Sequence, residues 1–287
     1  MRKIINRLLI FFIGVPFFVC LVWFKQQHHF VLHIVITLSA MIAASELVSI
    51  FSRTFKVQSR LMLIIMSGVS PFVALLHTFF DFPIAFVDYA FTACIMICLA
   101  REVFSAKVFE DSNSHILTSS FIILYSGFFI TFISKMTFFT LNGVSVSREI
   151  LITFLLMVFM CDSLAWFFGV LFGKGNRGIV KASPNKSIAG FAGGIAGSIL
   201  SGIVCKIIWQ DVFHGSFIKM IILGAIIALA SIAGDLAESV IKRSANCKDS
   251  GNIVPGRGGI LDSIDSIAFS APVYYVTVSY MFNCAVA

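Results

Sequence analysis

Residues 239–265 read SVIKRSANCKDSGNIVPGRGGILDSID and separate two long apolar runs in a chain with few charges. The stretch holds four basic residues, three acids, four glycines and one proline. A backbone broken by glycine and proline cannot face lipid, because its polar groups would lack hydrogen-bond partners there. We therefore expect the stretch to lie in water or to line a wet cavity. Carboxylates beside lysines and arginines are the groups that metal-bound phosphate chemistry requires.

The composition of the whole chain indicates a membrane protein. Of its 287 residues, 59% are hydrophobic and 12% are charged, and the mean hydropathy is +0.98. A soluble domain carries about 25% charged residues. The net charge of +7 does not indicate a nucleic-acid partner, because the basic residues gather in the connections between apolar runs. That distribution is typical of membrane orientation and of attraction to anionic lipids.

Apolar runs of about 20 residues, each long enough to cross a bilayer, follow one another along the sequence. They cover residues 8–24, 30–51, 61–80, 83–100, 116–134, 150–172, 188–208, 217–237 and 267–286. We therefore predict an all-α polytopic membrane protein with about nine transmembrane helices. No small-residue cleavage site follows the first run, which is interpreted as a retained helix rather than a signal peptide.

Two regions differ in their chemical content. Residues 1–147 are predicted to form about five transmembrane helices with little chemistry of their own. Residues 148–287 are predicted to form a transmembrane catalytic region with cytoplasmic loops at 173–187 and 238–266. Alternate connections carry most of the lysines and arginines, which predicts a cytoplasmic N-terminus, an external C-terminus and a polar site at the cytoplasmic face. The predicted location is a bacterial inner (cytoplasmic) membrane.

Acidic side chains recur at helical spacing on both sides of the charged stretch. Asp235, Glu238, Ser239 and Lys242 would share one face of a helix at i, i+3, i+4 and i+7. Asp262 and Asp265 would share a face if a short helix starts after Gly259. One carboxylate pair from each segment could hold a divalent cation with positions left open for phosphates, which suits magnesium. The pairs His28–His29 and Cys94–Cys98 have metal-like spacing but are interpreted as a loop and as core, so no histidine or cysteine cluster offers a softer metal site.

The charged stretch resembles the signature of the phosphatidate cytidylyltransferase (CDP-diacylglycerol synthase) family. That signature reads S-x-x-K-R, K-D, P-G-H-G-G and L-D-R-x-D at fixed spacing. The matching positions are Ser239, Lys242, Arg243, Lys248, Asp249, Pro255, Gly256, Gly258, Gly259, Asp262 and Asp265. Arg257 stands where the family has histidine, and Ser263 stands where it has arginine.

The resemblance extends upstream to the sixth apolar run and the basic loop after it. Matching positions there are Asp162, Trp166, Gly173 and Lys174, and then Ser183, Pro184, Lys186, Ser187 and Gly190. Asn185 replaces a family lysine, and Ala189 replaces its glutamate. Backbone N–H groups at the start of the seventh helix could hold a phosphate, whereas the residues alone favour a plain basic loop. For Asp162, catalysis and helix packing both stay open.

The resemblance implies that CTP and phosphatidate react to give CDP-diacylglycerol and diphosphate, with Mg²⁺ as cofactor. It implies Asp235 and Asp262 as metal ligands, and the catalytic residues Lys242, Arg243, Lys248, Asp249 and Asp265. The substrate-binding residues would be Ser183, Lys186, Ser187, Ser239, Gly256, Arg257, Gly258 and Gly259. The partners are the two substrates and membrane lipid, without nucleic acid, and a homodimer is an open alternative.

Two other functions stay open on the residues. One is a transporter or an inactive lipid-binding homologue, an alternative that the residues Ala189, Arg257 and Ser263 support. The other is a membrane CDP-alcohol phosphotransferase, whose D-G-x-x-A-R pattern is absent from the sequence. Glu46 and Asp88 are acids within apolar runs and so are functional candidates. Because Glu46 lies near a helix end, we interpret it as a snorkelling or helix-pairing residue, and we interpret Asp88 in the short fourth run in the same way.

Overall fold

The computed structural model describes residues 15–23, 28–80, 82–106, 108–254 and 256–286. The described chain is mostly helical, as predicted. Residues 8–14 and 24 of the first predicted span, the basic residues before it and Pro255 lie outside the described residues. Within the described part, α2 covers Val15–Trp23, inside that first span.

Six helical stretches of the described residues are long and apolar enough to cross a membrane. They are Phe30–Phe51 (α3), Arg60–His77 (α4), Ser112–Met136 (α6 with the segments after it), Ser147–Phe172 (α8), Ile188–Ile208 (α9) and Phe217–Ser244 (α10). Each overlaps one predicted apolar run. The other two long helices are α5 (Phe86–Ser105) and α11 (Leu261–Phe282). The count of nine spans therefore stays a prediction.

The chain divides into two compact units, and helices α10 and α11 each contain a boundary between them. Unit 1 contains the described residues of 25–135 and 241–264, and unit 2 those of 9–24, 136–240 and 265–287. Segment 241–264, which is most of the signature stretch, thus belongs with the N-terminal helices of unit 1.

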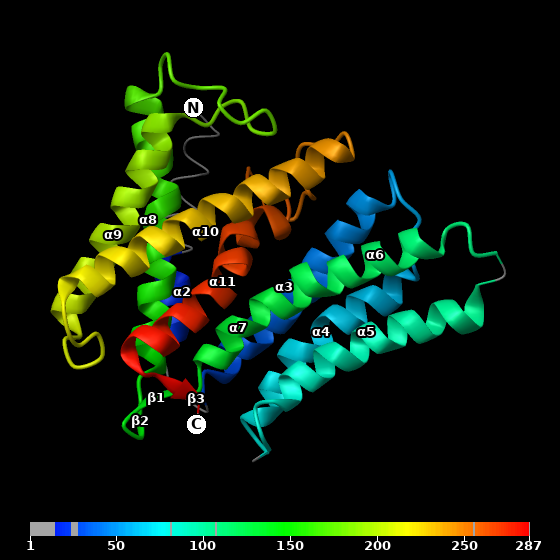
Figure 1. The fold of residues 1–287 in the computed structure, drawn as a ribbon, viewed down its shortest axis with the longest axis horizontal. Helices are drawn as coiled ribbons and strands as arrows, with labels where there is room; N and C mark the ends of the chain where they lie inside the picture. Colours follow the sequence, from blue (N-terminus) through cyan, green and yellow to red (C-terminus); the bar gives the residue numbers. More distant parts are fainter. Residues whose placement is uncertain (1–14, 24–27, 81, 107, 255, 287) are drawn as a thin grey trace. The chain divides into compact units, whose positions relative to one another are not determined.

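Unit 1 is built from packed helices. In Figure 1, α3, α4 and α5 lie beside one another, and α4 also packs against the helix that follows α5. That helix runs through α6 (Ser112–Ile122), a π-helical turn η2 (Ile123–Phe128) and α7 (Phe129–Met136). Its Gly127 lies so close to α4 that an added Cβ would be 2.5 Å from the carbonyl oxygen of Ser67. Only glycine allows this approach of two backbones.

Unit 2 is organised by the close pairing of α8 and α9, which run side by side in Figure 1. Gly190, Gly193, Gly194 and Gly197 line this contact. A Cβ on Gly197 would lie 2.6 Å from the carbonyl oxygen of Met160, and one on Gly193 would lie 2.7 Å from Phe168. These glycines therefore permit the close packing of α8 and α9.

A small antiparallel sheet in unit 2 is the exception to the predicted all-helical fold. Its strand order is β2 (Val144–Ser145), β1 (Phe139–Leu141) and β3 (Ala285–Val286). Asn142 and Gly143 connect β1 to β2, and both have positive φ, at 51° and 79°. An Asn-Gly pair with this geometry is the preferred two-residue hairpin turn, because its twist matches that of the strands.

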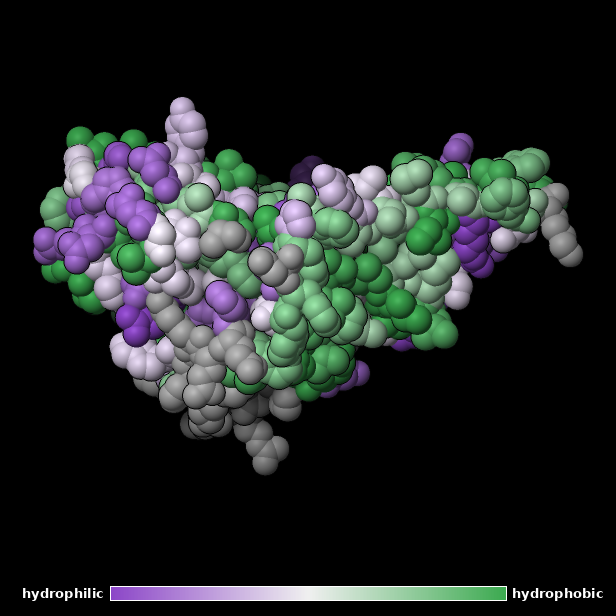
Figure 2. Space-filling view, turned by 90° about the horizontal axis from the view of Figure 1, so that it is seen from below, coloured by the Kyte–Doolittle hydropathy of each residue, from purple (hydrophilic) through white to green (hydrophobic). Residues whose placement is uncertain are grey.

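Large apolar side chains cover much of the exposed surface, as expected for helices that face lipid. Figure 2 shows broad hydrophobic areas next to smaller polar ones on the face that it displays. Phe104 and Tyr280 are 87% and 88% exposed, and Leu61 and Val276 are also exposed. Contact with hydrocarbon removes the cost that such side chains would have in water.

Candidate active site

The glycine-rich part of the signature stretch forms a tight turn between α10 and α11. The Val254 N–H donates to the Gly258 carbonyl at 2.7 Å, and the Gly258 N–H donates to the Val254 carbonyl at 3.0 Å. Gly256 and Gly258 have φ of 80° and 120°. Residues other than glycine rarely adopt these backbone angles, so the turn requires glycine at positions 256 and 258.

Asp262 lies at the centre of the hydrogen bonds that hold this turn. One carboxylate oxygen accepts from Lys242 Nζ at 2.5 Å. The other accepts from the backbone N–H of Gly259 at 2.7 Å, and from the N–H and hydroxyl of Ser250 at 2.8 Å each. A Cβ on Gly258 would lie 2.3 Å from that oxygen. The loop is therefore wrapped around the Asp262 carboxylate, and Gly258 makes room for it.

The pKa of Asp262 reflects two opposing effects. Burial would by itself raise the pKa of the carboxyl, but the hydrogen bonds from Lys242 and from the backbone of Gly259 and Ser250 outweigh burial. The net effect holds the pKa below its ordinary value. Asp262 precedes the predicted apolar run 267–286, so its carboxylate is an ionised group at neutral pH.

Glu46 reaches the same loop from α3. Its carboxylate accepts hydrogen bonds from the Ser250 hydroxyl at 2.9 Å, the Ile260 N–H at 3.0 Å and the Leu261 N–H at 2.8 Å. Only 6% of the residue is exposed. The snorkelling interpretation of Glu46 is therefore wrong, whereas its hydrogen bond with Leu261, the first residue of α11, agrees with the helix-pairing alternative. The sequence holds no local sign of this contact, because the two partners are more than 200 residues apart.

Unit 2 contains a second group of carboxylates. Asp235 forms an ion pair with Lys186, and Glu238 and Asp265 are buried. Asp235, Glu238 and Asp162 all lie within electrostatic range of Asp265. The predicted helical spacing at 235, 238, 239 and 242 is confirmed, because α10 runs unbroken through all four positions. The spacing of Asp262 and Asp265 is confirmed as well, because α11 begins at Leu261.

The basic loop 173–187 of unit 2 leads into α9. Arg177 and Ser187 form an isolated β-bridge, and the Arg177 guanidinium donates to the Gly169 carbonyl at 3.1 Å. Ser187, predicted to bind substrate, is buried and caps α9 by accepting from the Gly190 N–H at 3.1 Å. Ser183 begins a turn closed by the Lys186 N–H.

The remaining predicted residues differ in exposure. Arg243, Lys248, Asp249 and Gly256 are exposed, Arg257 is partly exposed, and Ser239 is buried. Arg243 donates to the Cys247 carbonyl at 3.3 Å. The exposed side chains of Arg243 and Lys248 are accessible to solvent.

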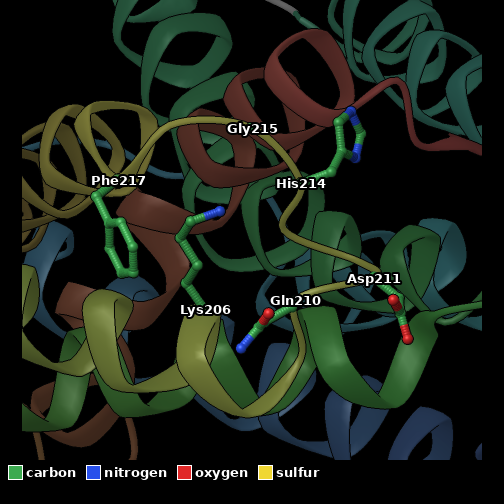
Figure 3. A pocket seen from close by; sticks show the side chains of 6 residues that line it. All are labelled: Lys206, Gln210, Asp211, His214, Gly215 and Phe217. Carbon is green, nitrogen blue, oxygen red and sulfur yellow. The ribbon is translucent and has the colours of Figure 1, made fainter.

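A cavity in unit 2 is lined by none of the predicted site residues. It measures about 450 Å³ and lies at the connection of α9 and α10. Figure 3 shows Lys206, Gln210, Asp211 and His214 around it. Lys206 donates to the Phe213 carbonyl and lies 5.3 Å from the centre of the Phe217 ring. Its ammonium group is therefore already satisfied by the protein.

Apolar helices of membrane-crossing length and a buried carboxylate–lysine site together define a helical integral membrane protein. The chain belongs to the Cytidylyltransferase family, whose sequence model matches residues 5–281. Similar curated proteins are named phosphatidate cytidylyltransferase. The one from Synechocystis is 39% identical over 126 residues, or 43% of this chain and 42% of the relative.

Two further relatives carry the same name. The protein from Helicobacter pylori is 34% identical over 50% of this chain and 53% of the relative. The protein from Thermotoga maritima is 29% identical over 69% of this chain and 70% of the relative. The chain thus spans about half the length of the first two relatives, and more of the third.

Proposed function

We propose that this protein is a phosphatidate cytidylyltransferase that converts CTP and phosphatidate to CDP-diacylglycerol and diphosphate. Membership of the Cytidylyltransferase family and the names of the relatives support this proposal. The single observation that carries it is the Lys242–Asp262 pair, which connects the end of α10 to the start of α11 across the loop of the family signature. A fixed carboxylate beside a fixed ammonium group, with exposed cations nearby, suits a reaction between two phosphates.

The proposed reaction transfers a nucleotidyl group. A phosphatidate oxygen forms a bond to the α-phosphorus of CTP, and the bond from that phosphorus to the oxygen leading to the β-phosphorus breaks. The electron pair leaves with diphosphate. A phosphate monoester is largely dianionic near neutral pH, since its second pKa is about 6. The chain therefore needs no strong general base.

The main barrier is electrostatic, because two anions must approach and charge develops on the leaving group. Lys242, Arg243, Lys248 and Arg257 are the basic side chains that would contact phosphates. Arg243 and Lys248 are exposed and can meet CTP from water. Asp249 and Asp265 would act as supporting acids.

Magnesium is proposed as the cofactor, with Asp235 and Asp262 as its predicted ligands. The donors fit by chemistry, because both are carboxylates and magnesium prefers oxygen ligands. Each of the two now forms an ion pair with a lysine, Lys186 or Lys242, so each already accommodates positive charge. Among the described residues no group of three His, Cys, Asp or Glu side chains forms a ready metal cage. A bound magnesium ion would neutralise substrate phosphates and leave positions open for them.

The proposed setting is a bacterial inner membrane with the reaction on its cytoplasmic side. The acyl chains of phosphatidate would stay against the apolar helices while the head group meets CTP. A homodimer is a proposal about assembly that the mass of the detergent-solubilised protein would test.

The decisive experiment uses purified protein in detergent with labelled CTP and phosphatidate. We expect CTP-dependent formation of CDP-diacylglycerol and release of diphosphate in equal amounts. A folded protein that binds phosphatidate but forms no product would instead support the inactive lipid-binding homologue. Product formation only with a CDP-linked lipid and an alcohol would support a phosphotransferase.

A further inference from the structure

Glu46 is an acid within a helix of membrane-crossing length, and its surroundings in unit 1 are unusual for such a residue. It lies one and a half turns before the end of α3 at Phe51 and is buried. Its carboxylate accepts three hydrogen bonds, all from residues of the signature loop or the start of α11. A buried acid whose hydrogen-bond donors all come from one short segment of the chain holds that segment in place.

Two of these hydrogen bonds determine where α11 begins. The first N–H groups of a helix have no partner inside the helix, and negative charge at that end is favourable. Glu46 supplies the missing acceptors for Ile260 and Leu261. Asp262 is the next residue, so the start of the helix fixes the position of its backbone.

The third hydrogen bond connects Glu46 to Asp262 through one side chain. The Ser250 hydroxyl oxygen lies 2.9 Å from Glu46 Oε2 and 2.8 Å from Asp262 Oδ2. A serine hydroxyl has one hydrogen to donate. The two carboxylates therefore share this hydrogen, and a change at Glu46 alters the hydrogen bond that Asp262 accepts from Ser250.

The Glu46 carboxylate also explains why two positions of the loop are glycine. A Cβ on Gly259 would lie 2.3 Å from Glu46 Oε2, and one on Gly251 would lie 2.6 Å from Glu46 Oε1. These separations are too short for real atoms. The loop backbone thus lies directly on Glu46, which is possible only because both positions are glycine.

We propose that Glu46 is a positioning residue for the cytidylyltransfer reaction: it fixes the Asp262 carboxylate through the Ser250 hydroxyl and the first N–H groups of α11. The inference rests on the proposed function for its kinetic consequence and on the hydrogen bonds alone for its structural part. Glu46 itself need not contact either substrate.

The test compares the unaltered protein with Glu46→Gln. Glutamine keeps the shape of the side chain but places an N–H₂ group where a carboxylate oxygen accepts hydrogen bonds. We expect kcat to fall at least tenfold, about 1.4 kcal/mol of lost transition-state stabilisation, with the KM for CTP changed less than twofold. Hydrogen–deuterium exchange of peptides covering 250–262 should become about tenfold faster, because glutamine keeps only one acceptor oxygen and the amide of either Ile260 or Leu261 loses its partner.

Glu102→Gln is the matched control. Glu102 is also a buried acid of unit 1 with three side-chain partners, Gln58, Ser112 and His115, but none belongs to the loop. Its replacement should leave both kcat and the exchange of 250–262 unchanged. If Glu46→Gln does not fold, Ser250→Ala removes the hydroxyl that connects the two carboxylates and should lower kcat in the same way, whereas the amides of Ile260 and Leu261 keep Glu46 as their acceptor and should exchange at an unchanged rate.

The outcomes separate the inference from the proposed function. Unchanged exchange in folded Glu46→Gln overturns the inference. Faster exchange with normal kcat overturns the positioning role and leaves only a structural one. If the unaltered protein forms no CDP-diacylglycerol, the proposed function fails, and the exchange measurement still decides whether Glu46 holds the loop.

Discussion

The ammonium group of Lys242 lies 2.5 Å from Oδ1 of Asp262, and the two side chains are only 11% and 6% exposed. Both groups have lost most of their water. Their mutual attraction and the hydrogen bonds from Ser250 and Gly259 offset that loss. Replacement of either residue by an uncharged one should therefore destabilise the folded protein far more than the loss of a surface ion pair would.

Lys242→Met should destabilise the protein by about 3–5 kcal/mol, since it leaves a buried carboxylate without its cation. Thermal or denaturant unfolding in detergent measures this change. Lys181→Met is the control, because Lys181 is exposed in the loop before α9 and should shift stability by at most about 0.5 kcal/mol. Equal stability of the two variants would contradict a buried pair.

The stability contributed by Asp262 should depend on acidic pH. Its folded-state pKa is lowered, so the ionised form is favoured by folding. The contribution is complete above the ordinary pKa of 3.8 and is lost as pH falls through the lower folded value. The stability difference between the unaltered protein and Asp262→Asn, about 2 kcal/mol at neutral pH, should thus shrink below pH 4. A difference that grows on acidification would contradict the assignment.

Turnover should depend on magnesium. A chelator should abolish CDP-diacylglycerol formation, and added Mg²⁺ should restore it. Asp262→Asn should remove nearly all turnover in folded protein, whereas Asp211→Asn, on the exposed α9–α10 connection, should not. Near-normal turnover of Asp262→Asn would exclude its predicted role as a metal ligand.

The topology predicted from the basic residues is testable with reporter fusions at positions 55, 180 and 250. All three should report the cytoplasm, because lysines and arginines gather in those connections. An external signal at 250 would contradict both the orientation and the supply of CTP to the signature loop.

Arg257 and Ser263 depart from the family signature, and we predict that the two changes compensate. Arg257 would supply the cation that position 263 lacks, with a planar contact that lysine cannot copy. Ser263 now donates to the Gly259 carbonyl at 3.2 Å. Arg257→Lys and Arg257→His should each lose about tenfold or more in turnover, an effect of about 1.4 kcal/mol. Adding Ser263→Arg to Arg257→His should recover activity, and a double variant no better than Arg257→His would rule compensation out.

Local patterns in the sequence predicted most of the helices and much of the candidate site. The 30–51 and 188–208 runs coincide with α3 and α9, because apolar runs of that length have few other stable forms in lipid. Helical spacing grouped Asp262 with Asp265. The Asn142–Gly143 pair is typical of a β-hairpin turn, but the prediction of an all-α fold included no hairpin.

The role of Glu46 could not be predicted from local patterns. Its partners Ser250, Ile260 and Leu261 are far along the chain, and an acid near a helix end is usually solvated. Ser187 illustrates the opposite case. A serine directly before an apolar run is a common helix N-cap, and the structure assigns it that task.

The length of α10 determines how deep its charged end lies. With 28 residues the helix is about 42 Å long, whereas the hydrocarbon layer is about 30 Å thick. The excess corresponds to about eight residues, the length of the segment 237–244, which contains Glu238, Lys242 and Arg243. If α10 stands upright and begins at the opposite surface of the hydrocarbon layer, these groups lie at the depth of lipid phosphates. A lipid substrate could reach them by lateral diffusion within its own leaflet, without ever being extracted from the bilayer.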